Sequence, residues 1–390
     1  MKPLAGITVV TLEHAIAAPF ATRQLADLGA RVIKVERPGA GDFARGYDSR
    51  VRGLSSHFVW ANRSKESLAI DIKHPGARSW LERLVGRADV LVQNLAPGAA
   101  ERLGLGYERL SAADPRIVVC DISGYGSDGP LRDKKAYDLL IQSEAGFLSV
   151  TGTGDEPCKA GPSIADIAAG MYAYSGILAA LMERQRSGRG RRLDISMLES
   201  LVEWNSYPLY YAFDGAAPPA RTGASHATIY PYGPFPARDG SVMLGLQNER
   251  EWTSFCEVVL QRPGLARDPL YAGNAQRAAN RAQLREIIAQ AFSGLDVAQV
   301  EARLDQARIA NARVNDMHAV WAHPQLQARG RWCEVGSPAG GVPALFPPGS
   351  PPGGARMDPV PALGEHTESI LAELGASPGD ISAMRQAGAI

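Results

Sequence analysis

A single carboxylate stands in a long apolar stretch of this chain. Residues 164–182 hold one charged side chain, Asp166, among mostly Ala, Ile, Leu, Met, Gly and Tyr. A carboxylate in this setting can cap a helix, interrupt a membrane span, or attack a carbonyl carbon as a nucleophile. The choice between capping and reactivity stays open on the stretch alone.

A membrane span is the weakest of these interpretations. A span needs about 20 apolar residues and is penalised by an ionised side chain, and no second such stretch occurs. The pattern indicates a buried helix with Asp166 in its first turn, where the helix dipole stabilises an anion. Ser163 is the better N-cap, so the helix does not require Asp166 as its cap.

Other catalytic motifs are weak or missing. Residues 124–129 read GYGSDG, but Pro130 follows at once, so the helix that a dinucleotide site needs cannot begin there. The chain has no P-loop, HExxH or GxSxG motif, and its histidines do not cluster as metal ligands. Cys158 has no histidine near it in sequence, which favours a structural role.

Composition sets further bounds. Lys+Arg and Asp+Glu balance at 41 each, so no net field draws the molecule to nucleic acid or to an anionic membrane. The four cysteines lie far apart without a CxxC pair, which argues against a zinc site and a disulfide framework. The N-terminal apolar run is too short for a signal peptide. We expect a cytoplasmic protein.

The elements that must position Asp166 alternate between strand and helix. Strands are predicted at 6–12, 30–36, 89–95, 116–123 and 191–197, and helices at 18–29, 75–88 and 99–113. This alternation predicts an α/β fold with a parallel sheet. Ligands of such sheets bind at the carboxyl ends of the strands.

The second half of the chain has a different character. Residues 226–246 are rich in aromatic residues, Pro and Gly and end in a strand, and helical patterns follow at 249–260, 280–292 and 295–307. They predict a second, smaller domain. A stretch dense in Pro and Gly, at 336–355, reads as an ordered, wandering connection or linker before a last helix at 366–375.

Six ordered motifs resemble one family. They include VIKVERPGAGD, ISGYGSDGPLRDKKAYDLLIQ, GPSIADIAAGMYAYSGILAALMER and RTGASHATIYPYGPF. From Leu4 to about Leu374 the chain resembles the class III CoA-transferases, which include formyl-CoA transferase, carnitine CoA-transferase and the related 2-methylacyl-CoA racemases.

The resemblance implies a fold and an assembly. A Rossmann-like large domain with a parallel sheet is joined to a smaller α+β domain, and two subunits form an interlocked homodimer. The expected division is 1–200 for the N-terminal part of the large domain, 201–224 for a linker, 225–320 for the small domain, and 321–390 for a linker and the return to the large domain.

By position, the resemblance makes Asp166 the catalytic aspartate. Its carboxylate would attack an acyl-CoA thioester and form a mixed anhydride, then an aspartyl-CoA thioester. Coenzyme A enters as part of the substrate, and no permanent cofactor and no metal are implied. The racemases pair the same aspartate with a histidine, where this chain has Tyr137. A phenol loses its proton only near pH 10 and is a poor base at neutral pH, so a transferase is favoured over a racemase.

The resemblance also assigns binding residues. The expected CoA contacts are Ile16, Ala17, Arg37, Lys73, Asn94, Arg102, Lys135 and Tyr137. The expected acid-binding residues are Asp138, Arg221, His226, Gly245 and Gln247.

Residues 245–248 stand where formyl-CoA transferases have a run of glycines, which disfavours oxalate and formyl substrates. The wording of the small-domain motifs favours succinyl-CoA as donor and a C4–C6 dicarboxylate such as itaconate as acceptor. An inactive CoA-thioester-binding protein is a further alternative, but the retention of Asp166, Lys135 and Tyr137 argues against it.

Overall fold

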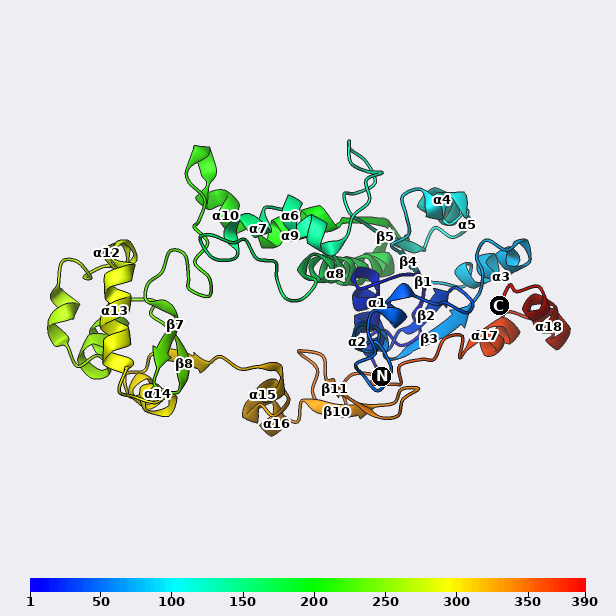
Figure 1. Ribbon diagram of the computed structural model, residues 1–390. Helices are drawn as coiled ribbons and strands as arrows, with labels where there is room; N and C mark the ends of the chain where they lie inside the picture. The colour runs from blue at the N-terminus through cyan, green and yellow to red at the C-terminus, as the bar shows by residue number, and fades with distance from the viewer. The chain divides into compact units, whose positions relative to one another are not determined.

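A computed structural model describes residues 1–390, which form two compact units (Figure 1). The large unit comprises residues 1–146, 160–205 and 324–390, and the small unit comprises residues 147–159 and 206–323. The chain therefore leaves the large unit and returns to it.

The large unit is built on a six-stranded parallel sheet with the order β3-β2-β1-β4-β5-β6. Its strands are β1 (Thr8–Leu12), β2 (Arg31–Glu36), β3 (Lys65–Ala69), β4 (Val90–Gln93), β5 (Val118–Ser123) and β6 (Arg192–Ser196). The Val, Ile and Leu side chains of β1, β2, β4 and β5 are buried, as expected for strands covered on both faces. The predicted parallel sheet is confirmed.

The large unit also contains twelve helices, several of which pack on this sheet. They are η1 (Phe43–Gly46), α1 (Ala17–Asp27), α2 (Ser56–Asn62), α3 (Pro75–Val85), α4 (Ala99–Arg102), α5 (Tyr107–Ala113), α6 (Asp138–Glu144), α8 (Ile164–Ser187), α9 (Met197–Trp204), α16 (Pro324–Ala328), α17 (Thr367–Glu373) and α18 (Pro378–Gln386). Ile370 and Leu371 of α17 join the core formed by β1, β2 and α3, which anchors the returning C-terminus.

The strand order singles out one crevice as the expected ligand-binding site. The order reverses between β1 and β4, so the connections that follow these two neighbouring strands leave in opposite directions. Ligands of open α/β sheets bind at the carboxyl ends of the strands beside such a switch point. The loop from β1 to α1 and the segment after β4 are therefore the first places where a ligand is expected.

Helix α8 is the predicted apolar helix, and it runs for 24 residues to a left-handed Gly188. By length and hydropathy it is the one helix that could cross a membrane, a test that core helices of soluble proteins also pass. Here α8 packs on α1, α9, β5 and β6, with most of its alanines and Gly170 buried. The predicted packing of small residues against neighbouring elements is confirmed.

The small unit is an α+β structure, as predicted. An antiparallel sheet, β7-β8-β9, comprises Tyr232–Ala237, Gly240–Gly245 and Ala310–Arg313. Its helices are α7 (Phe147–Val150), α10 (Ser206–Tyr211), η2 (Phe213–Gly215), α11 (Glu249–Ser254), η3 (Phe255–Val259), η4 (Pro263–Arg267), α12 (Asn274–Ala279), α13 (Arg281–Phe292), α14 (Val297–Gln306) and α15 (Met317–Trp321). Trp252, Phe255, Ile288, Phe292 and Leu304 fill its core.

Two segments differ from the expected division. Residues 147–159 belong to the small unit, because Arg221 donates hydrogen bonds to the carbonyl oxygens of Thr153 and Gly154, each at 2.8 Å. The Pro- and Gly-rich connection contains a hairpin of β10 (Trp332–Val335) and β11 (Val342–Leu345), whose strands pair antiparallel.

Candidate active site

Asp166 lies in the first turn of α8 and is half-buried. The helix dipole places partial positive charge at this end, which favours an anion. The residues that surround Asp166 come from α6 and α1, which lie beside α8 in the large unit.

The cap of α8 is supplied by another helix. Asp138, at the start of α6, accepts hydrogen bonds on Oδ1 from the backbone N–H groups of Ala165, at 2.8 Å, and Asp166, at 3.2 Å. Its Oδ2 accepts a bond of 2.7 Å from Gln142. Ser163 stands at the N-cap position, but its side chain makes no capping bond, so its predicted capping role is wrong. The capping function is taken by Asp138, and Asp166 is free for another role.

A second helix terminus reaches Asp166. The backbone N–H of Ala17, the first residue of α1, lies close enough to the Asp166 carboxylate to lower its pKa. Gly170, one turn further along α8, allows this approach: a Cβ there would lie 2.7 Å from the Ala17 carbonyl oxygen and 2.9 Å from the ring of Phe20. The glycine and the neighbouring alanines bring the two helices close enough for their N-terminal ends to meet at one carboxylate.

The surroundings make Asp166 a weak acid. Burial and, secondarily, the charge of Asp138 raise its pKa to about 7, although the Ala17 N–H opposes this rise. Tyr47 follows η1, and burial together with the charges of Asp42 and Asp166 raises its pKa to about 12, so this phenol keeps its proton. The centre thus combines a carboxyl group that titrates near neutrality with a neutral tyrosine in its electrostatic neighbourhood.

The loop from β1 to α1 is held from two sides. Asn94, directly after β4, accepts the His14 N–H at 2.8 Å and donates to the His14 carbonyl oxygen at 2.9 Å. Asp42 accepts the Ala15 N–H at 3.2 Å. Ala15 adopts a left-handed φ of 60°, a conformation that costs a non-glycine residue on the order of 1 kcal/mol. The loop is therefore fixed in a strained conformation at the switch point of the sheet.

His14 stands two residues after β1, beside this crevice, and one nitrogen of its ring lacks a hydrogen-bond partner. Its imidazole stacks on Phe43 with ring centroids 5.3 Å apart, and its Nδ1 is buried with no hydrogen-bond partner. Burial lowers the pKa of His14, which keeps the ring neutral. A neutral ring with an unused polar atom is suited to contact a ligand at this edge of the sheet.

The predicted cationic CoA contacts follow three strands of the sheet, β2, β3 and β4. Arg37 comes directly after β2, Lys73 follows β3, and Arg102 ends α4 after β4. All three are exposed. Lys135 is exposed in the loop between β5 and α6. Because the carboxyl ends of parallel strands share one edge, Arg37, Lys73 and Arg102 form a basic margin around the switch point.

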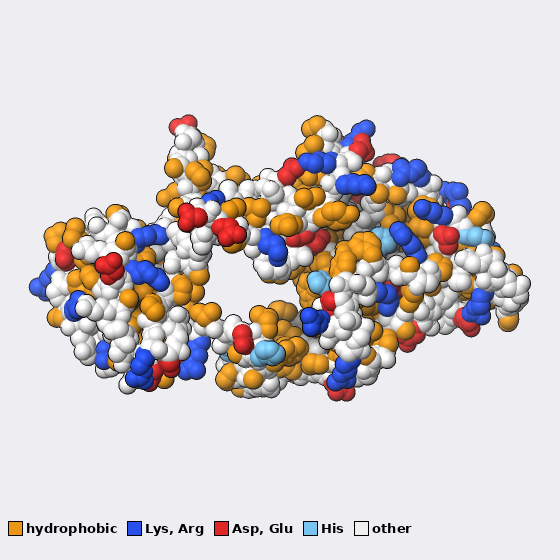
Figure 2. All heavy atoms as spheres, viewed as in Figure 1, with side chains coloured by type: hydrophobic (Ala, Val, Ile, Leu, Met, Phe, Trp, Pro, Cys, Tyr) orange, Lys and Arg blue, Asp and Glu red, His pale blue; other side chains and the backbone are white.

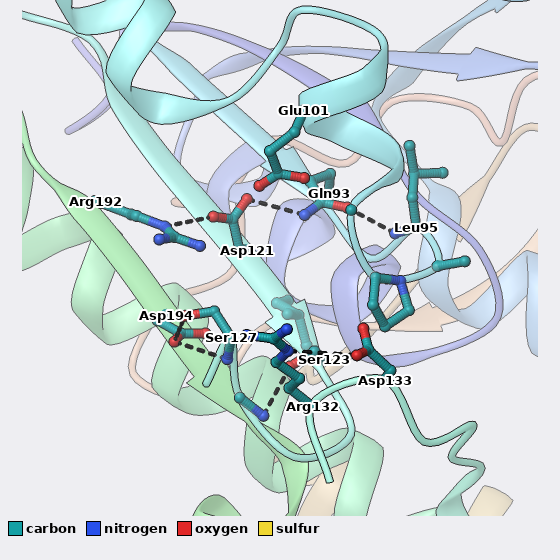
Figure 3. A pocket seen from close by; sticks show the side chains of 15 residues that line it. Gln93, Leu95, Glu101, Asp121, Ser123, Ser127, Arg132, Asp133, Arg192 and Asp194 are labelled. Carbon is teal, nitrogen blue, oxygen red and sulfur yellow. Dashed lines mark hydrogen bonds and ion pairs between the residues drawn. The ribbon is translucent and has the colours of Figure 1, made fainter. Parts of the chain in front are cut away.

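The part of the same edge formed by β4, β5 and β6 also carries acidic side chains. A pocket of about 310 Å³ lies at the ends of β4, β5 and β6, with four carboxylates and two arginines in its wall (Figure 3). Asp121 is engaged there by Gln93 at 2.9 Å and Arg192 at 2.8 Å, and Asp194 accepts from the backbone of Ser127 at 3.0 Å. An excess of negative charge makes this pocket unsuited to phosphate groups, so the basic margin is the better place for them.

The remaining predicted residues divide between the units. Ile16 and Ala17 begin α1, and Tyr137 is the exposed N-cap of α6, which places them with Asp138 in the large unit. Arg221, His226, Gly245 and Gln247 all lie in the small unit.

Within the small unit three residues form a stack. Gly245 pairs with Tyr232 across β7 and β8, and a Cβ at 245 would lie 2.8 Å from the Tyr232 ring. That ring stacks on His226 with centroids 5.4 Å apart. His226 also accepts the backbone N–H of Ile229 on Nδ1 at 3.0 Å. Gln247, just beyond, is exposed.

Sequence reasoning missed three residues of this centre: His14, Asp42 and Tyr47. His14 could have been noticed because it stands two residues after a predicted strand, and Asp42 because it ends the motif VIKVERPGAGD, which carries the family resemblance. Tyr47 lies in a segment without a clear periodic pattern, and its proximity to Asp166 arises only from the fold.

Comparisons with known proteins agree with this geometry. Residues 4–367 match CoA-transferase family III. The chain is 34% identical to succinyl-CoA:glutarate CoA-transferase of Mus musculus over 96% of its own length and 87% of that protein. It is 33% identical to succinyl-CoA:mesaconate CoA-transferase of Haloarcula hispanica, over 97% and 98% of the two chains.

A crystal structure of a CAIB/BAIF family protein from Brucella suis aligns with a TM-score of 0.83 at 32% identity, over 96% of this chain and 99% of that one. The match to the family, the relatives of similar length and the shared fold place the chain in one group of enzymes. The protein belongs to CoA-transferase family III.

Proposed function

We propose that this CoA-transferase moves CoA from succinyl-CoA to itaconate or another C4–C6 dicarboxylate, with Asp166 as the nucleophile. The observation that carries the proposal is the carboxylate of Asp166 at the meeting point of two helix N-termini, with its capping role taken by Asp138. The names of the relatives, whose acceptors are glutarate and mesaconate, support a dicarboxylate as the acid.

The reaction proceeds in four balanced steps. The Asp166 carboxylate attacks the thioester carbonyl, so a mixed anhydride forms and CoA thiolate leaves. The thiolate attacks the aspartyl carbonyl of the anhydride, which releases succinate and leaves aspartyl-CoA. The acceptor carboxylate attacks the carbonyl carbon of aspartyl-CoA and expels the thiolate again, so a second mixed anhydride forms between Asp166 and the acceptor. The thiolate then attacks the acceptor's carbonyl, which yields the new acyl-CoA and free Asp166.

The environment of Asp166 suits these steps. A carboxylate of higher pKa is a stronger nucleophile, and with a pKa of about 7 a large fraction of Asp166 is ionised at neutral pH. The Ala17 N–H and the dipole of α1 favour negative charge at the same place. They stabilise the tetrahedral oxyanions that form when the aspartyl carbonyl is attacked.

Coenzyme A carries a diphosphate and a 3′-phosphate, which need cationic partners. The basic margin of Arg37, Lys73 and Arg102 supplies them at the carboxyl edge of the sheet, with Lys135 on the loop toward α6. The thioester end then enters the crevice beside His14 and the start of α1.

The active form is a homodimer. The segment around α9 and α10 exposes large apolar side chains that a lone chain leaves in water: Trp204 is 46% exposed, Tyr207 53%, Leu209 55%, Tyr210 79% and Phe213 74%. Figure 2 shows apolar side chains over the segment that bears α10. A run of this size marks an interface, and a second copy of the chain is its occupant. We place this dimer in the cytoplasm.

A direct exchange experiment tests the proposal. The protein is incubated with succinyl-CoA and a panel that includes itaconate, mesaconate, glutarate, citramalate and oxalate, and new CoA esters are followed by mass spectrometry. Formation of a dicarboxylyl-CoA ester supports the proposal. Folded protein that exchanges no acid would instead indicate an inactive thioester-binding protein, and racemisation of a 2-methylacyl-CoA would favour the racemase alternative.

A further inference from the structure

Four buried charged side chains lie beneath the loop that approaches Asp166. Glu13 ends the β1 segment, Lys34 is in β2, Lys65 begins β3 and Asp42 precedes η1, and each is at most 3% exposed. Lys65 donates to Glu13 at 2.6 Å, and Lys34 donates to Asp42 at 2.8 Å and to Glu13 at 3.3 Å. The charges therefore balance within one connected cluster.

Glu13 and the two lysines of the cluster are ionised at neutral pH. Burial would raise the pKa of Glu13, but Lys65 and Lys34 outweigh it and lower the value to about 2. Burial lowers the pKa of Lys65 to about 8 against the attraction of Glu13. Burying four charges is costly, and a fold keeps such a cluster where it fixes a specific arrangement.

The cluster is tied to the loop through one carboxylate. Asp42 uses Oδ2 for Lys34, and its Oδ1 accepts the backbone N–H groups of Ala15, at 3.2 Å, and Ala44, at 2.9 Å. Ala15 has the left-handed φ, and two residues later the Ala17 N–H lies beside the Asp166 carboxylate and lowers its pKa. Lys34 is thus connected to Asp166 through Asp42 and through the hydrogen bond that Asp42 accepts from the strained backbone of Ala15.

We infer that Asp42, anchored by Lys34 within the buried cluster, is a positioning residue that holds the Ala15 backbone so that the Ala17 N–H meets Asp166. Asn94 braces the same loop from the other side through His14. This inference rests on the proposed role of Asp166. It assigns the cluster a task in the reaction in addition to its part in the fold.

The direction in which the pKa of Asp166 shifts when Asp42 is replaced distinguishes a positioning role of Asp42 from a purely electrostatic one. The groups that face Asp166 are Asp138 of α6, the N–H of Ala17 in α1, and Tyr47. The pKa of Tyr47 is also raised by its electrostatic interaction with Tyr137. Removal of the Asp42 charge alone could not raise the pKa of Asp166, because a like charge nearby can only raise that pKa while it is present. Displacement of the loop would raise it, because the carboxylate would lose a hydrogen-bond donor.

The experiment titrates Asp166 directly in the full-length protein. The chain is labelled with 13C at the aspartate Cγ, and the Asp166 resonance is assigned by its loss in Asp166→Asn. We expect Asp42→Ala to raise the midpoint by about 0.5–1 pH unit and Asp42→Asn, which keeps an acceptor for the Ala15 N–H, to raise it less. The acid limb of the kcat profile should move in the same direction.

Asp27 provides a matched control at the other end of α1. It is buried and paired with Arg63 through bonds of 2.8 and 2.7 Å, so Asp27→Ala removes a comparable buried ion pair far from the loop. In the Asp27→Ala variant, the titration midpoint of Asp166 should equal that of the wild type. If Asp42→Ala does not fold, Asn94→Ala serves as the second variant, with an upward shift of the same size expected.

The inference is overturned if folded Asp42→Ala titrates like the wild type or at lower pH, or if Asp27→Ala shifts Asp166 equally. Because the titration needs no turnover, it also separates the two proposals. A wild type that transfers CoA to no acid would contradict the proposed function, while the shift in Asp166 would still decide whether Asp42 positions the loop.

Discussion

Replacement of Asp166 by Asn should stabilise the fold in a pH-dependent way. The amide occupies nearly the same volume, and its oxygen can still accept the Ala17 N–H. The variant differs chiefly in the charge that the half-buried site must hold. A reactive carboxylate kept in this environment lowers the stability of the folded protein, and the Asn variant is relieved of that cost.

The size of the effect follows from the pKa of Asp166, which burial raises from 3.8 to about 7. Between these values the folded chain holds a proton that the unfolded chain has lost, so stability falls as the pH rises. Three pH units at about 1.4 kcal/mol each give an upper limit of about 4 kcal/mol above pH 7. Solvent screening of a half-buried group reduces this to about 2 kcal/mol.

Urea unfolding, followed by circular dichroism at fixed protein concentration, measures this difference. From about pH 5 to about pH 8.5, the advantage of Asp166→Asn over the wild type should grow by about 1–3 kcal/mol. The exposed Asp155 gives a matched control, and Asp155→Asn should show no such growth. A constant or shrinking advantage for Asp166→Asn would refute the claim that burial disfavours the charge at this site.

Three further perturbations test the neighbouring contacts. Asp138→Asn keeps the cap of α8 but removes a charge beside Asp166, so the acid limb of the kcat profile should move down by a few tenths of a pH unit; an upward shift would contradict this. Gly170→Ala places a Cβ 2.7 Å from a carbonyl oxygen of α1, so it should lower the free energy of unfolding by about 1–3 kcal/mol and lower kcat by a larger factor. Gly176→Ala is the control, because its Cβ would meet only a leucine side chain at 3.4 Å, and it should fold and react normally. Glu13→Gln leaves two buried lysines without their shared partner and should lower the free energy of unfolding by about 3–5 kcal/mol, measured by urea titration.

Much of the fold could be predicted from the sequence because its signals are local. The apolar β-branched runs of β1, β2, β4 and β5 and the periodic helices α13 and α14 carry their own patterns. Strand β3 was missed because it begins with Lys65 and Glu66, which read as surface charges. Lys65 is buried only because Glu13, far away in sequence, neutralises it. The β10–β11 hairpin was hidden by the prolines and glycines around it.

In the candidate site, too, features that depend on neighbouring residues could be predicted from the sequence, whereas contacts between residues far apart in the sequence could not. The apolar stretch around Asp166 predicts its place at a helix start, and the family motifs predict its chemistry. That Asp138 caps α8 could not be predicted, because the two residues are joined only through the packing of α6 on α8. The clamp of Asp42 on the Ala15 backbone likewise depends on a loop conformation that the residue types do not specify.

The central claim is that Asp166 becomes covalently linked to the substrate. The most direct measurement is mass spectrometry of peptides from protein quenched during exchange with succinyl-CoA, with hydroxylamine used in parallel to trap activated carboxyl groups. The account predicts a CoA thioester, or a hydroxamate after trapping, on Asp166 alone and on no residue of Asp166→Asn. Exchange that continues in Asp166→Asn, or an adduct on another residue of an active wild type, would contradict it.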